Sequence, residues 1–222
     1  MTFSSALHVR RGVTAVIGGG GKTTLLRRLG EELQQRGTVL LCTTTKMYPF
    51  SDLPWACTAE ELDALRQSCR LLCAGVPLEG TGKLTAPPVS MAELAARFDY
   101  VLVEADGSAG RPMKAHASHE PVIPSMADQT ILVLGASGFG RPIAEVAHRP
   151  ELYARLTGSG MGDAITPQLA AKVLLAEGLH TRVLINQVET AESMAAAESL
   201  AKLLDCPTAA GSAQKGDILC LL

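Results

Sequence analysis

The fold is decided by the stretch VTAVIGGGGKTTLLRRLGEEL, residues 13–33. It begins with an apolar run that predicts a buried strand and ends with leucines at helical spacing. Between them lies a glycine-rich loop that closes with lysine and threonine. A strand, such a loop and a helix in this order are the setting of a phosphate-binding loop. The stretch therefore predicts an α/β protein that binds a nucleoside triphosphate.

Each residue type in this loop has a predicted part in nucleotide binding. Glycines let the backbone curl so that successive N–H groups point at phosphate oxygens, with the positive end of a helix behind them. The lysine bridges the terminal phosphates, and the first threonine hydroxyl ligates Mg²⁺. The predicted nucleotide-binding residues are Gly18, Gly19, Gly20, Gly21, Lys22, Thr23 and Thr24. The alternative is a glycine-rich turn that a lysine happens to follow.

The loop departs from the strict spacing G-x-x-x-x-G-K-[ST], because Val16 stands where that pattern has glycine. The compact form that remains resembles the loop of the Mur and folylpolyglutamate ligases, which make acyl phosphates with ATP. An ATP-dependent ligase is therefore an alternative function. The chain of 222 residues argues against the extra domains of Mur-type ligases.

Short apolar runs alternate with helical segments along the rest of the chain, as in a parallel sheet covered by helices. We expect a P-loop NTPase-like three-layer sandwich with a mainly parallel central sheet, formed by one domain over residues 1–222. The predicted strands are residues 13–17, 38–42, 70–74, 100–104, 131–134 and 182–186. Residues 77–88 and 107–124 are rich in glycine and proline and are predicted as loops.

Helix starts are marked by side chains that cap free backbone N–H groups. Thr58 with Glu61, and Ser90 with Glu93, fit capping boxes. Thr166 before a proline starts a helix that runs to residue 177 and stops at a glycine. An alanine-rich helix is predicted over residues 190–204.

Bulk composition excludes two classes of partner. A net charge of -2 offers no basic field for a nucleic acid. No run is apolar for long enough to span a membrane, and the N-terminus has no signal-like apolar core. We expect a cytoplasmic protein. Its six scattered cysteines suit buried reduced thiols better than a structural zinc site.

Two acids close the apolar run DYVLVEAD, residues 99–106. If the strand stays extended, Glu104 and Asp106 leave the sheet on the same side. A carboxylate at this position holds Mg²⁺, and a second acid orients the attacking water or the substrate. We assign Glu104 to the metal and Asp106 to catalysis or sensing. Alternatively, one of them only caps the next turn.

Polar residues also follow two other strands, at the edge where such sheets bind ligands. Thr44, Thr45 and Lys46 are candidates for a switch that contacts the terminal phosphate, or are simply residues that finish a strand. Residues 186–189, N-Q-V-E, resemble the N-K-x-D base-recognition motif of GTPases, and residues 212–216 resemble its S-A-K loop. Asn186 and Glu189 are therefore candidates for base binding, with a helix cap as the alternative. ATP and GTP both remain open.

The motifs together resemble the YqeC family. The resemblance rests on residues 18–24 and 43–47, most specifically on VEADGSAGRPMKAHASHEPVIP, residues 103–124, and continues through residues 140–142, 148–151 and 163–167. It implies an accessory protein of selenium-dependent molybdenum hydroxylases, with these enzymes or the selenium and molybdenum cofactor machinery as partners. The family commonly has the Asn-Lys-x-Asp motif, from which this chain departs at Gln187 and Glu189.

The segment 105–124 is the predicted functional loop, and it carries four further candidates. Arg111 and Lys114 suit a clamp for an anionic substrate. His116 and His119 suit a metal, a proton carrier or hydrogen bonds to the loop backbone. We expect an NTP-hydrolysing protein that uses Lys22, Glu104 and Asp106. The alternatives are a kinase or ligase acting on a small anionic substrate, and a nucleotide-dependent binding module that does not hydrolyse.

Overall fold

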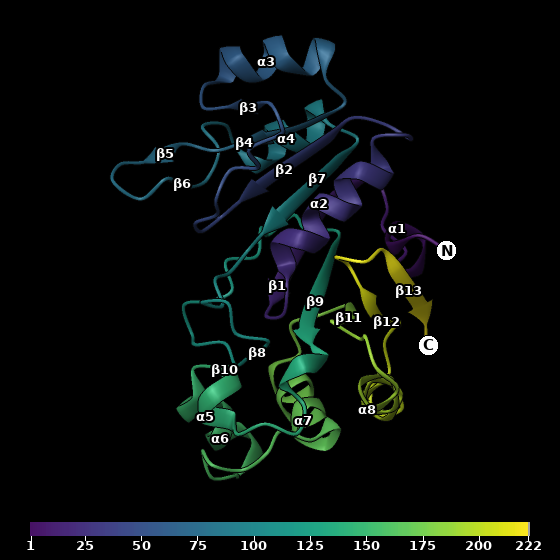
Figure 1. The fold of residues 1–222 in the computed structure, drawn as a ribbon. Coiled ribbons are helices and arrows are strands. Elements are labelled where there is room, and N and C mark those ends of the chain that lie inside the picture. Colours follow the sequence, from purple (N-terminus) through teal and green to yellow (C-terminus); the bar gives the residue numbers. More distant parts are fainter. Residues whose placement is uncertain (222) are drawn as a thin grey trace.

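The computed structural model describes residues 1–221. A sheet of nine strands crosses the molecule in the order β13-β12-β11-β9-β1-β7-β2-β4-β3 (Figure 1). All neighbouring strands are parallel except β13, which runs antiparallel to β12. The strands of this sheet are β1 (Gly12–Gly18), β2 (Val39–Thr43), β3 (Trp55–Ala56), β4 (Leu71–Ala74), β7 (Tyr100–Glu104), β9 (Gln129–Gly135), β11 (Arg182–Asn186), β12 (Thr208–Ser212) and β13 (Asp217–Cys220).

Helices cover both faces of the sheet, because the side chains of its strands alternate between two apolar layers. In β1, Val16 packs with α1 and α2, whereas Ala15 and Ile17 pack with the helices of the opposite face. This confirms the predicted three-layer sandwich of the P-loop NTPase type. The helices are α1 (Phe3–Ala6), α2 (Lys22–Leu33), α3 (Ala59–Ser68), α4 (Met91–Arg97), α5 (Ile143–Val146), α6 (Pro150–Thr157), α7 (Pro167–Glu177) and α8 (Ala191–Ala201).

The two ends of the chain lie on the same side of the molecule, where α1 contacts β13 (Figure 1). Both predicted capping boxes are present, at Thr58 and Ser90. Thr166 caps α7, and Gly178 ends it in the left-handed conformation. Within residues 1–221, no helix is both long enough and apolar enough to cross a bilayer.

Three predictions of local structure were wrong in part. The segment 77–88 contains a hairpin of β5 (Pro77–Leu78) and β6 (Lys83–Leu84). The segment 107–124 contains β8 (Met113–Lys114), which pairs with β10 (Ala147–His148). These strands have two residues each, too few for a periodic pattern to show. The helix expected over 190–204 ends at Ala201.

The strands β12 and β13 were not predicted. β12 has no strand-like pattern because it consists of small residues. Its sequence is TAAGS, which carries none of the large β-branched or aromatic residues that favour a strand. The neighbouring backbone explains the small side chains. A Cβ atom on Gly211 would lie 2.0 Å from the carbonyl oxygen of Asp217 in β13.

Candidate functional site

The glycine loop connects the end of β1 to the start of α2 in the middle of the sheet. Gly18, Gly20 and Gly21 have φ angles of 98°, 67° and 107°, a region that residues with a Cβ atom rarely adopt. Gly21 is the N-cap of α2, and Lys22 is its first residue. The sequence therefore needs glycine here so that the chain can turn sharply from strand to helix.

The first three N–H groups of the loop are already hydrogen-bonded inside the protein. Gly18 donates to Asp106 Oδ2 at 2.9 Å, Gly19 to the carbonyl of Val133, and Gly20 to the carbonyl of Arg111. The N–H groups of Lys22, Thr23 and Thr24 lie in the first turn of α2, where a helix offers no backbone acceptor. These donors are therefore open to an anion, and the hydrogen bonds of Gly18 to Gly20 fix the shape of the loop.

Thr23 and Glu104, the two residues predicted to hold a metal ion, lie next to each other. Thr23 Oγ1 donates to Glu104 Oε2 at 2.7 Å, so the first threonine of α2 meets the last residue of β7. Glu104 is buried, which raises the pKa of its carboxyl, while the charge of Lys22 and the Thr23 hydrogen bond oppose that rise. A hydroxyl and a carboxylate are the oxygen ligands that Mg²⁺ prefers beside phosphate. This donor set fits the ion.

Lys22 is turned back toward the loop. Its ammonium donates to the carbonyl of Gly18 at 2.7 Å and lies 3.2 Å from Asp106 Oδ1 and 3.4 Å from Ser108 Oγ. Only 4% of its side chain is exposed. The carbonyl of Gly18 and the carboxylate of Asp106 therefore hold the Lys22 ammonium next to the first turn of α2.

Asp106 is completely buried and receives donors from two segments, the glycine loop and residues 114–116. Its Oδ2 accepts from Gly18 N–H and lies 2.8 Å from His116 Nε2 and 3.0 Å from Lys114 Nζ. Burial alone would raise the pKa of Asp106, but the His116 hydrogen bond and the charges of Lys22 and Lys114 lower it to about 2. The carboxylate thus stays ionised. Both predicted acids face the loop, as the alternation along the strand predicts.

The partner of His116 on the other side is Glu177, which the sequence analysis missed. His116 Nδ1 lies 2.7 Å from Glu177 Oε2, and the His116 N–H donates to Glu177 Oε1 at 2.6 Å. Burial lowers the pKa of His116, but the hydrogen bonds to Asp106 and Glu177 outweigh burial and raise it. The imidazole therefore joins two carboxylates as a cation, rather than contacting the loop carbonyls.

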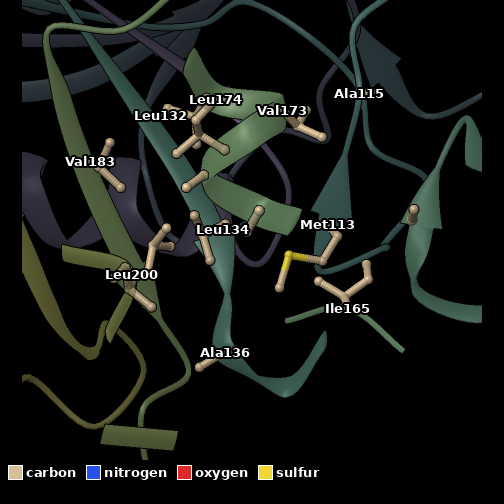
Figure 2. Close-up of a cluster of buried hydrophobic side chains, with 14 of the residues drawn as sticks. Met113, Ala115, Leu132, Leu134, Ala136, Ile165, Val173, Leu174, Val183 and Leu200 are labelled. Carbon is tan, nitrogen blue, oxygen red and sulfur yellow. The ribbon is translucent and has the colours of Figure 1, made fainter. Parts of the chain in front are cut away.

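The functional loop is held by alternate side chains. Met113 and Ala115 enter the apolar cluster formed with Leu134 and Leu174 (Figure 2). Because neighbouring side chains of an extended segment point in opposite directions, Lys114 and His116 face Asp106. The core therefore sets the position of this ionic network.

The stability that His116 contributes should depend on pH. A raised pKa means that this contribution is complete below the unfolded pKa, about 6.5, and is lost as pH rises through the folded value. We expect the difference in unfolding free energy between wild type and His116→Gln to shrink as pH increases above neutrality. Denaturant titrations across pH measure it. His8→Gln, at an exposed histidine, is the control, and an equal trend in both variants would contradict the assignment.

Lys114 and His119 lie behind the site, in a network that includes Glu120 and Arg149. Lys114 is buried between Asp106 and Glu120, at 3.0 Å from each, and Arg149 Nε donates to Glu120. His119 Nε2 lies 3.2 Å from Arg149. The structure thus gives Lys114 carboxylate partners of its own, and a role for it in clamping an anionic substrate stays a prediction. Arg111 is exposed, and its carbonyl supports Gly20.

The threonines after β2 are used inside the protein. Thr44 Oγ1 donates to the carbonyl of Val122 at 2.6 Å, and Thr45 N–H donates to Thr43 Oγ1 at 3.0 Å. Both threonines follow the last residue of β2, and their role as a phosphate switch stays a prediction. Lys46 instead lines a hollow of about 270 Å³ beside Lys22.

Asn186 and Glu189 lie on the other side of the loop. Asn186 is buried, donates to the carbonyl of Gly20 at 2.7 Å and accepts from Ala213 N–H at 2.8 Å. Glu189 accepts from Ser212 at 3.0 Å and pairs with Lys215 at 2.7 Å. The two segments that resemble a base-recognition motif therefore meet, and Asn186 connects them to the glycine loop.

The comparison with known proteins identifies the family. The family model described as YqeC protein matches residues 14–151, which include the glycine loop, both acids and the functional loop. This chain belongs to the YqeC family. A YqeC relative, "Uncharacterized protein YqeC" of Escherichia coli (strain K12), is 37% identical over 155 residues, covering 66% of this chain and 60% of the relative. The chain thus matches about three fifths of that YqeC protein's length. The base-motif segments lie outside the YqeC family match.

Within residues 1–221, no cluster of three or more histidine, cysteine or acidic side chains is arranged to hold a metal ion. Cys42 and Cys73 are buried free thiols, and burial raises the pKa of both, that of Cys73 to about 12. The hydroxyl of Thr23 and the carboxylate of Glu104 are oxygen ligands that fit a cation.

Proposed function

We propose that this YqeC family member binds a nucleoside triphosphate with Mg²⁺ and hydrolyses it as an accessory protein in the maturation of selenium-dependent molybdenum hydroxylases. One observation carries the nucleotide part of this proposal: Thr23 Oγ1 and Glu104 Oε2 are 2.7 Å apart beside the first turn of α2. A phosphate-bound Mg²⁺ needs this pair of oxygens next to free N–H donors. The accessory role follows from the family resemblance.

The residues of the site divide the work. The N–H groups of Lys22, Thr23 and Thr24 bind phosphate oxygens, and Thr23 with Glu104 holds Mg²⁺, which neutralises phosphate charge when bound. Lys22 exchanges Gly18 and Asp106 for the terminal phosphates. Asp106 keeps its charge and orients Lys22 and Gly18, so we assign it to sensing of the nucleotide rather than to proton abstraction.

Glu189 decides the base in this proposal. A carboxylate that accepts from both N–H groups of guanine selects GTP, and Glu189 Oε2 is engaged by the exposed Lys215. A preference for GTP that Glu189→Ala removes would assign base reading to Glu189. Equal affinities for ATP and GTP would mean that Glu189 does not read the base and only forms its ion pair with Lys215.

The first test is equilibrium binding of fluorescent ATP and GTP analogues with and without Mg²⁺. We expect Lys22→Ala to weaken binding by about 100-fold, the effect of losing two charge-assisted hydrogen bonds of about 1.5 kcal/mol each. Lys202→Ala, at an exposed lysine after α8, should leave the affinity unchanged. Equal loss in both variants, or binding of neither analogue, would refute the proposal.

A kinase or ATP-dependent ligase is the second candidate, and the hollow beside Lys22 favours it. Its lining includes cations beyond the loop, at Lys46 and Lys83. A binding module that does not hydrolyse is the third. Nucleotide binding that survives Asp106→Asn with loss of turnover supports the first two. Nucleotide binding without turnover in the wild-type protein, unchanged in Asp106→Asn, supports the third.

A further inference from the structure

The hollow of about 270 Å³ has two walls of different origin. One wall belongs to the nucleotide site. The other comes from the segment after β2, from Lys83 at the start of β6 and from residues 107–110, none of which the nucleotide-binding loop requires. The lining residues are Gly21, Lys22, Thr23, Lys46, Met47, Tyr48, Lys83, Glu104, Gly107, Ser108, Ala109 and Gly110.

The second wall is built by a backbone bridge. Met47 and Leu84 exchange N–H to carbonyl hydrogen bonds of 3.0 and 2.8 Å, and both side chains are buried against Cys73. Because side chains alternate in extended segments, the neighbours Lys46 and Lys83 are directed away from that core. Both line the hollow, so the bridge between the segment after β2 and β6 presents two cations to it.

These cations form no ion pairs, and the acid that acts on Lys83 from a distance is Glu104. Among residues 1–221, neither Lys46 nor Lys83 has a carboxylate within ion-pair distance, whereas Lys22 is paired with Asp106. The Lys83 ammonium lies 4.9 Å from the centre of the Tyr48 ring, an attraction that holds its position without neutralising it. Glu104 is the one acid of the lining, and the Mg²⁺ site uses it.

The residues proposed to bind the base lie on the other side of the glycine loop. In the sheet order, β11 with Asn186 is on one side of β1, and β7 and β2 are on the opposite side. A base near Asn186 and Glu189 therefore points away from the hollow, which meets only the phosphate end. A hollow of 270 Å³ is small even for a ligand pocket, so it suits a small molecule.

We propose that Lys46 and Lys83 bind the phosphate group of a second, small substrate beside the terminal phosphate of the nucleotide. This inference rests on the proposed nucleotide site and names the class of molecule that shares it. Two ammonium groups that form no ion pair attract a dianionic oxyanion. The small residues 107–110, with open space beside Gly107 and Gly110, leave room for the rest of a small phosphorylated compound. A carboxylate offers the same contacts with half the charge.

The test uses the whole chain saturated with Mg²⁺ and a non-hydrolysable ATP or GTP analogue, whichever binds more tightly. Methyl phosphate is titrated by ³¹P NMR and calorimetry, with acetate as the carboxylate probe. We expect methyl phosphate to bind, acetate to bind more weakly, and the double variant Lys46→Met with Lys83→Met to weaken methyl phosphate by about tenfold or more. The nucleotide affinity of that variant should change by less than about threefold. Lys202→Met is the matched control.

Each outcome separates the two proposals. Failure of the nucleotide to bind removes both. Nucleotide binding without methyl phosphate binding, or methyl phosphate binding that the double variant retains, overturns the second site alone. Loss of nucleotide affinity equal to the loss of methyl phosphate affinity assigns both lysines to the nucleotide and also overturns it. If acetate binds more tightly than methyl phosphate, the second substrate is a carboxylate, and the proposed substrate class is wrong.

Discussion

Replacing Asp106 by alanine should destabilise the protein by about 3–5 kcal/mol, the loss expected when one partner of a buried ionic network is removed. Lys22, Lys114 and protonated His116 would then face one another without the carboxylate that separates their charges. Asp106→Asn keeps an oxygen acceptor for Gly18 and should lose less. Chemical denaturation measures the free energy of unfolding for both variants.

Asp52→Ala is the matched control, because Asp52 forms an exposed ion pair with Arg27 at 2.7 Å. Such a pair contributes less than about 1 kcal/mol. The lowered pKa of Asp106 adds a pH signature: its contribution is present above the unfolded value of 3.8 and is lost as pH falls through about 2. The gap between wild type and Asp106→Asn should therefore narrow in acid. Equal losses for Asp106→Ala and Asp52→Ala would contradict the network.

Gly20→Ala should cost about 3 kcal/mol and abolish nucleotide binding. Its φ of 67° alone costs an alanine about 1 kcal/mol. A Cβ atom would also lie 2.2 Å from the N atom and 2.6 Å from the Cα atom of Gly135, so the loop or the end of β9 must move, at about 2 kcal/mol more. Denaturation and nucleotide titration measure both effects.

Gly158→Ala isolates the two causes. Gly158 has a φ of 71°, and the space where its Cβ atom would lie is empty to 4 Å. This variant should show the cost of the left-handed conformation without the collision. If Gly20→Ala loses no more stability than Gly158→Ala, the close approach between the loop and β9 does not constrain the protein.

Much of the fold follows from local signals. Thr58 and Ser90 start helices where their capping boxes predict, since a cap depends only on residues within one turn. The buried strands are continuous apolar runs, and six of them were placed to within two residues at each end. β12 was not predicted because its residues are small, as close packing against β13 requires, and that contact is not visible in the local sequence.

The core of the site was predictable for a topological reason. The carboxyl ends of parallel strands meet at one edge, which brings Glu104 and Asp106 to Thr23 and Lys22. The outer residues were not. Lys83 reaches the hollow from a hairpin whose strands are too short to show a pattern in the sequence. Glu177 reaches His116 from a helix that is distant in the sequence. One signal for Glu177 existed: an acid in the last turn of a helix opposes the helix dipole and needs a cation nearby.

Because Glu177 ends α7, the length of this helix determines where its carboxylate lies. It is the last of the 11 residues of this helix, and both of its carboxylate oxygens hold His116. One residue inserted into α7 would turn its end by about 100° and advance it by about 1.5 Å. The acid would then leave the imidazole, which in turn orients Asp106 toward the glycine loop. The length of α7 thus sets the position of the acid that holds His116. Relatives that keep this histidine should tolerate substitutions in α7 but not insertions or deletions.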